Sequence, residues 1–179
     1  MKLVPLLIFL LVPALLVITL GGFYPVAAVD GSPILSGTWK KAQVAAKKFV
    51  MSQNKAGPED YTPVLADIKR NTLTFLIEDA ILRQEGEKLI RGFDRLSRAR
   101  MLEAIQGGGG LASAAKLIYG LTLPEFQDLV LLPQARRDTA REILAERQVD
   151  FEKWFAEAKK SKKVKLYFVP FIWDGEAVR

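Results

Sequence analysis

The spacing of hydrophobic positions divides the chain into an apolar N-terminal segment and a longer part with helical and strand-like patterns. Residues 3–20 carry no charge, and as a helix they would extend about 27 Å, close to the hydrocarbon thickness of a bilayer. Apolar residues then recur at helical spacing, while residues 26–29 and 164–172 show strand patterns. We therefore predict a mainly α protein, with residues 1–23 as a transmembrane anchor or signal sequence and residues 24–179 as one helical domain.

The first two helices of this domain are predicted from apolar stripes. The first begins at Ser36, a candidate N-cap, and ends near Gln53. Its inner face is expected to hold Trp39, Ala42, Ala46, Phe49 and Val50. The second begins near Thr62, and Gly86 marks its expected end or a bend. Its apolar stripe comprises Leu73, Leu76, Ile77, Ala80 and Ile81, and Asp79 is expected to pair with Arg83 four residues later.

Further helices are predicted along the second half of the chain. They span residues 91–106, residues 111–119, a segment from Pro124 to about Arg147, and a last helix after Asp150. Thr122 and Asp150 are expected to cap the last two, and Pro133 is expected to bend the longer one. We predict that the lysines at the end of the last helix are solvated, or else contact anionic lipid headgroups; they are Lys159, Lys160, Lys162 and Lys163.

Two strands are predicted, one near each end of the domain. The first, residues 26–29, leads into the turn signal Asp30-Gly31, and Pro33 is expected to stop further pairing. The second runs from Val164 to Ile172. Because a lone strand leaves its backbone groups unpaired, the two are expected to form a small two-stranded ribbon that joins the N- and C-terminal segments.

The charges flanking the apolar segment predict its orientation. Lys2 precedes it, and no further Lys or Arg follows until Lys40, so the positive-inside rule places the N-terminus in the cytoplasm and the domain outside. The alternative is secretion after signal cleavage, since residues 26–28 fit a small-residue cleavage site. Cleavage after Ala28 would cut through the predicted first strand, and the apolar stretch is longer than usual for a signal peptide.

Composition removes several kinds of chemistry. The chain has no cysteine and no histidine, which excludes disulfides, Cys/His zinc sites and His-dependent nucleophile pairs. The net charge of +6 suits a domain beside anionic lipid, and no stacking aromatics interleave with the basic clusters as in binders of single-stranded nucleic acid. The four glycines at 107–110 are not followed by the Lys-Ser/Thr of a phosphate-binding loop. We expect no metal, no cofactor, no nucleic acid and no enzymatic activity.

The order of the segments resembles the N-terminal domain of SurA-type and PrsA-type extracytoplasmic chaperones. Val29-Asp30-Gly31, followed by Pro33-Ile34 and a helix, is similar to the start of that domain, and residues 76–85 look like its core helix. Residues 119–126 and the closing segments at 151–154 and 164–166 are similar to later parts of the family pattern. The similarity spans roughly residues 25–168.

One departure from the family pattern is large. Many relatives carry a parvulin-type prolyl isomerase domain before the closing helix, whereas here residues 143–147 run almost directly into Asp150-Phe151. Parvulin sites use histidines, which this chain lacks. The resemblance therefore implies the chaperone part alone, without prolyl isomerase activity.

These observations predict a membrane-anchored chaperone-like protein that binds unfolded or exported polypeptides through apolar surfaces. The alternatives are an adaptor for a specific cell-envelope partner, or an accessory subunit of a peptidyl-prolyl isomerase system. The expected peptide-binding residues are apolar side chains left over after the core stripes are assigned, with ordinary core packing as the alternative for each. They are Tyr61, Phe75, Tyr119, Leu131, Leu132, Phe171 and Trp173.

Overall fold

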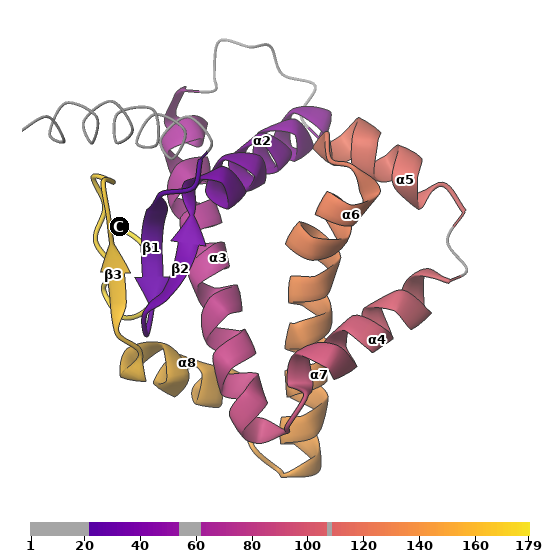
Figure 1. Cartoon of the computed structure of the whole chain (residues 1–179), viewed down its shortest axis with the longest axis vertical. Helices are drawn as coiled ribbons and strands as arrows, with labels where there is room; N and C mark the ends of the chain where they lie inside the picture. The colour runs from indigo at the N-terminus through magenta and orange to yellow at the C-terminus, as the bar shows by residue number, and fades with distance from the viewer. Residues whose placement is uncertain (1–21, 54–61, 107–108) are drawn as a thin grey trace, which may run out of the picture.

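The computed structural model describes residues 22–53, 62–106 and 109–179. These residues form a mainly helical protein with one small antiparallel sheet (Figure 1). The predicted fold class is thus confirmed in its coarse form. The expected anchor falls almost entirely outside the described residues, and none of the helices within them is long and apolar enough to cross a membrane.

A β-hairpin begins the domain. Strands β1 (Pro25–Val29) and β2 (Ser32–Leu35) are joined by Asp30 and Gly31, whose φ angles of 47° and 84° suit a type I′ turn. The expectation that Pro33 would stop the pairing is wrong, because Pro33 lies within the ladder with β1. β2 is an edge strand, which tolerates a proline because one side of it has no neighbouring strand to bind.

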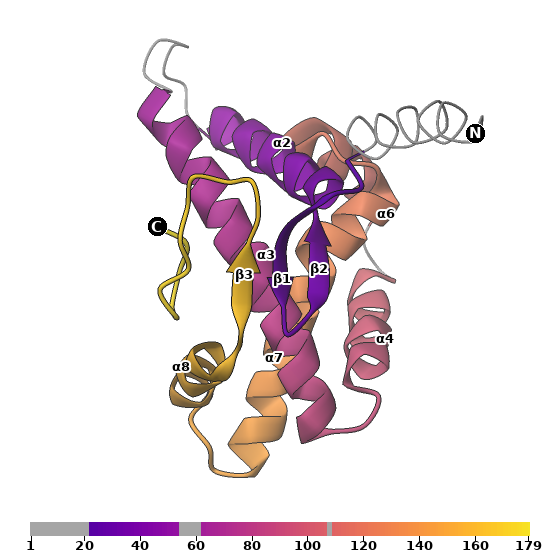
Figure 2. The same cartoon turned by 60° about the vertical axis from the view of Figure 1, so that its left-hand side comes forward.

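The C-terminal segment adds the third strand. β3 (Val164–Leu166) pairs antiparallel with β1, where Ala27 lies opposite Leu166, so the strand order is β2-β1-β3 (Figure 2). The two ends of the domain therefore pair as predicted, but in a sheet of three strands rather than a ribbon of two. The strand also ends at Leu166 instead of Ile172, and Phe168, at φ 55°, turns the chain out of the extended conformation.

Helix α2 (Ser36–Gln53) has the predicted bounds but not the predicted cap. The Ser36 hydroxyl is buried and has no hydrogen-bond partner among the described residues. Instead, the Ser36 N–H donates to the Tyr24 carbonyl and the Gly37 N–H to the Gly22 carbonyl, both at 2.9 Å. The backbone that precedes the hairpin thus binds the first turn of α2.

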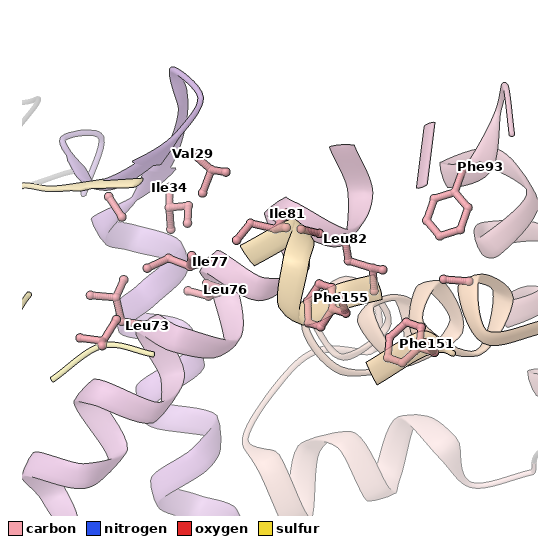
Figure 3. Packing of buried hydrophobic residues seen from close by; sticks show 14 of the residues in the cluster. Val29, Ile34, Leu73, Leu76, Ile77, Ile81, Leu82, Phe93, Phe151 and Phe155 are labelled. Atoms are coloured by element: carbon pink, nitrogen blue, oxygen red, sulfur yellow. The ribbon is translucent and has the colours of Figure 1, made fainter. Parts of the chain in front are cut away.

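Helix α3 (Thr62–Leu89) carries the centre of the core. Leu73, Ile77 and Ile81 are fully buried, and Figure 3 shows the sheet on one side of this stripe and the rings of α8 on the other. Gly86 does not end the helix. A Cβ at Gly86 would lie 2.2 Å from Phe93 Cδ1, so the glycine lets the buried Phe93 ring pack directly on the α3 backbone.

Helices α4 (Phe93–Ile105), α7 (Leu132–Glu146) and α8 (Phe151–Ser161) surround the C-terminal half of α3. Between them, Asp79 pairs with Arg136 and not with the predicted Arg83: Arg136 Nη1 lies 2.6 Å from Asp79 Oδ2. Arg136 also donates to Asp94 at 2.7 Å. Burial raises the pKa of Asp79 against the opposing effect of Arg136. This buried ion cluster ties α3, α4 and α7 together.

The chain between α4 and α7 contains two wide π-helical turns. Helix α5 (Leu111–Ala114) continues into η2 (Ala115–Tyr119), and α6 (Leu123–Phe126) continues through η3 (Gln127–Leu131) into α7. The bend expected at Pro133 takes the form of the π turn η3 directly before it. A wider turn accommodates a proline that has no N–H to donate to the preceding turn.

Lys162 closes the domain and is not part of a solvated helix end as we expected. Its side chain is 5% exposed, and its Nζ lies 2.8 Å from Asp30 Oδ2 and 2.7 Å from Glu85 Oε1. The hydrogen bond from Lys162 lowers the pKa of Asp30. Lys159 likewise pairs with Glu78. Lys159 and Lys162 therefore join the C-terminal segment to α3 and to the hairpin turn, whereas Lys160 and Lys163 are exposed, as expected for a solvated helix end.

Candidate functional site

An open groove of about 660 Å³ lies between α2, α3, η2 and η3. Most of its described lining is apolar: Ala42, Ala45, Ala46, Phe49, Val50, Ile68, Phe75, Tyr119, Leu129, Val130 and Leu131. Its lining overlaps the second hydrophobic cluster, around Ala45, Ala115 and Phe126, more than the main core that α3 forms with the sheet and α8.

The turn between η2 and α6 brings one wall of the groove against α2. Gly120 ends η2 with φ 69°, and Thr122 then caps α6 in a capping box with Glu125, as its sequence position predicted. Lys41 Nζ lies 2.7 Å from Glu125 Oε1, which links this turn to α2. Hydrogen bonds from Lys41 and Thr122 lower the pKa of Glu125 to about 2.

Aromatic rings make the wall at the C-terminal end of α2. The Phe49 and Tyr119 rings stack at 5.3 Å between centroids, and Tyr119 contacts the buried Phe126 ring at 5.0 Å. Across the groove, Phe75 projects from α3. Phe49 and Phe75 are each 38% exposed. These two rings therefore present part of their apolar surface to solvent, while the rest of each ring packs against neighbouring residues.

The π turn η3 shapes the opposite wall. Three consecutive residues, Leu129, Val130 and Leu131, all line the groove. All three are partly buried and pack against the second hydrophobic cluster. This segment therefore contributes a continuous apolar stretch to the groove.

The polar residues of the groove offer little reactive chemistry. Within the described lining they are Asn71, Thr72 and Gln134, together with the phenol of Tyr119, and this lining contains no Asp, Glu, Lys or Arg. The Thr72 hydroxyl already donates to the Ile68 carbonyl at 2.6 Å within its own helix. The arrangement suits an apolar ligand with a few hydrogen-bonding groups.

The predicted binding residues fall into three groups. Phe75, Tyr119 and Leu131 line the groove. Leu132 is buried at 1% exposure and belongs to the core, and Phe171 and Trp173 pack against the main hydrophobic cluster at the C-terminal tail, away from the groove lining. These three residues pack in or against the core, which was the alternative to a binding role. The expected site residue Tyr61 lies outside the described residues.

Several lining residues were missing from the predicted set because we assigned them to core stripes. Ala42, Ala46, Phe49 and Val50 do lie on one face of α2, but that face forms a groove wall in addition to packing. A usable signal was present in the sequence: this stripe is poor in large aliphatic residues, since two of its five members are alanine. Small side chains on a helix face leave space when the facing elements do not close on them.

The chain was compared with protein-family models, with curated proteins and with solved structures, and no match was found in any of the three comparisons.

Proposed function

We propose that this protein is a membrane-anchored, extracytoplasmic chaperone-like protein that holds apolar segments of unfolded or exported polypeptides in the groove between α2, α3, η2 and η3. The observation that carries the proposal is the groove itself, with a mostly apolar described lining and two part-exposed aromatic rings. Exposed apolar surface gathered in one concave place is typical of sites that bind other molecules.

The groove is large enough to take apolar side chains of a polypeptide segment. Its volume of about 660 Å³ is within the range of about 300–1,000 Å³ found for sites that enclose small ligands. Because it is open to solvent along α2 and α3, a chain could enter with its apolar side chains and leave its polar backbone partly hydrated. Binding would follow the burial of apolar area, about 25 cal/mol per Å².

The proposal contains no catalytic step. A holding chaperone needs no nucleophile and no general base, and the described lining residues place neither beside the groove. In an assay with a proline-containing peptide we expect isomerisation at the uncatalysed rate; acceleration above that rate would contradict this part of the proposal.

The direct test is suppression of aggregation. The full chain, reconstituted in lipid nanodiscs, should keep several unrelated unfolded proteins soluble at comparable molar ratios, with empty nanodiscs as the control. Failure to protect any of them, combined with capture of one stoichiometric partner from an envelope extract, would favour the adaptor alternative. If protection appears only when a separate prolyl isomerase is added, the accessory-subunit alternative is favoured.

We propose the cytoplasmic membrane as the location, with the N-terminus inside and the domain outside. The uncharged stretch at residues 3–20 and the charges that flank it support this orientation. Fractionation combined with N-terminal sequencing of the mature protein tests it. An intact N-terminus in the membrane fraction is expected, and a shortened chain in the soluble fraction would favour secretion after cleavage.

A further inference from the structure

Helix α2 has two faces of different chemistry. One face, which includes Ala42, Ala46 and Phe49, lines the groove. The other is exposed and carries Lys40, Val44, Lys47 and Met51. At about 100° per residue, Lys40, Val44, Lys47 and Met51 fall within about 60° of one another, on the side opposite the groove. We call these four residues the cationic face. The Lys48 side chain instead lies against Gly120 at the end of η2, where a Cβ on Gly120 would be 2.5 Å from Lys48 Cδ.

The cationic face has no charge of opposite sign on its own helix. The 18 residues of α2 contain four lysines and no acidic residue. Lys41 pairs with Glu125, but Lys40, Lys47 and Lys48 form no ion pair with a described residue. Val44 and Met51, exposed at 55% and 50%, lie among these lysines. An ordinary solvated helix face mixes both signs of charge, whereas this face combines positive charge with apolar side chains.

The chain enters the domain on the same side of α2. Gly22 accepts a hydrogen bond from the Gly37 N–H, and a Cβ on Gly37 would lie 3.2 Å from the Gly22 oxygen. Gly22 therefore lies over the side of α2 to which Gly37 points. Gly37 precedes Val44 by seven residues, so the two share one side of the helix. The apolar sequence of residues 3–20 thus ends two positions before Gly22, which contacts the same side of α2.

Exposed aromatic rings lie beside this entry point. Phe23 is 62% exposed and Phe168 is 89% exposed. The Phe168 ring packs edge-on against Tyr24, with 6.4 Å between centroids, which brings the C-terminal segment next to the N-terminal one. Aromatic side chains are enriched at the level of the lipid headgroups, where a ring can contact the hydrocarbon on one side and water on the other.

We propose that the cationic face of α2, together with Phe23 and Phe168, rests on the surface of an anionic lipid bilayer and fixes the orientation of the tethered domain, so that the groove opens away from the membrane. This inference rests on the proposed membrane anchoring. Anionic lipid is the occupant because lysines that form no ion pair with a described residue, exposed apolar side chains and the point where the chain enters the domain meet on one side of α2. A basic residue at an anionic surface changes the binding equilibrium about fivefold.

The absence of cysteine from the chain allows a clean test. The full chain carrying Val44→Cys is labelled with a nitroxide or an environment-sensitive dye and reconstituted in nanodiscs of phosphatidylcholine, with or without phosphatidylglycerol. Glu146→Cys is the matched control, because Glu146 is also exposed but lies at the C-terminal end of α7, far from α2 in both views of the fold (Figures 1 and 2). Accessibility to a water-soluble quencher is measured for each label.

We expect the label at position 44 to be shielded in the anionic discs, exposed in neutral discs, and exposed again in high salt, while the label at 146 stays accessible throughout. Lys40→Gln with Lys47→Gln should reduce the shielded fraction relative to the free one about 25-fold. Arg91→Gln with Lys153→Gln, which removes the same charge elsewhere, should leave it unchanged. Equal accessibility at position 44 in both lipids would overturn the proposal.

Aggregation suppression by the same variants separates this inference from the proposed function. Loss of shielding at position 44 with full protection of unfolded proteins would refute only the orientation. Shielding by anionic lipid without any protection would leave the orientation standing and refute the chaperone proposal.

Discussion

Removing the two part-exposed rings of the groove should weaken the binding of an unfolded polypeptide, the client, by an amount that follows from their exposed area. Phe49 and Phe75 are each 38% exposed, and burial of a whole phenylalanine side chain contributes about 1.5–3 kcal/mol. A client that covers the exposed part of each ring would gain about 0.6–1.1 kcal/mol per ring. The double variant Phe49→Ala with Phe75→Ala should therefore bind an apolar peptide about 7- to 50-fold more weakly.

The assay is a fluorescence anisotropy titration of a labelled, permanently unfolded polypeptide against the full chain in nanodiscs. Leu102→Ala with Leu117→Ala is the matched control, because these leucines are 45% and 78% exposed but do not line the groove. Thermal unfolding of each variant separates loss of binding from loss of fold. An unchanged affinity in the folded groove variant, or an equal loss in the control, would refute the assignment of binding to the groove.

Three further predictions concern the fold that holds the groove. Gly86→Ala should lower the free energy of unfolding by about 1–3 kcal/mol, because its methyl group would overlap the Phe93 ring. Adding Phe93→Leu to this variant should recover part of that loss. A melting temperature of Gly86→Ala no lower than that of the wild type would contradict this packing. Thr122→Ala removes the capping box and should lower the free energy of unfolding by about 1 kcal/mol. A loss no larger than that of Thr38→Ala, at a half-buried position of α2, would show that the cap contributes nothing. Because the pKa of Asp30 is lowered in the folded state, its contribution to stability is complete above the unfolded pKa of about 3.9 and is lost as pH falls through the folded pKa. Asp30→Asn should therefore make the free energy of unfolding less dependent on pH in that window. An unchanged pH dependence would argue against the Lys162 contact.

Local patterns in the sequence were sufficient for most of the elements. The Asp30-Gly31 pair predicted a turn, which the structure confirms, although the second strand of the hairpin was not predicted, and Thr122 and Asp150 cap the helices that follow them. These features depend on residues within one turn of each other, so a pattern of a few positions carries the information. The apolar stripe of α3 was also predicted, because its members recur at helical spacing along one face.

Features set by distant parts of the chain were not predictable in the same way. Lys162 reads as one of several solvated lysines, yet it lies in contact with Asp30, 132 residues away in the sequence. Asp79 pairs with Arg136 across helices rather than with a neighbour on its own helix. Only the folded arrangement decides which charge meets which partner.

The groove shows the same limit at the functional site. Leu131 and Leu132 are adjacent and chemically identical, but the first lines the groove and the second is buried in the core. The stripe of α2 was recognised, whereas the incomplete closure of η2 and η3 over it could not be inferred from periodicity. Whether an apolar stripe becomes core or binding wall depends on how closely the facing elements approach it.

Site-specific photo-crosslinking reports whether an unfolded polypeptide occupies the groove. A photoreactive phenylalanine analogue is placed at position 75 of the full chain in nanodiscs and, as a control, at position 102, which is exposed outside the groove lining. After irradiation with an unfolded exported protein and with its folded form, we expect adducts from position 75 to the unfolded form only, and few from position 102. Equal adduct yields from the two positions, or equal yields with folded and unfolded protein, would contradict binding in the groove.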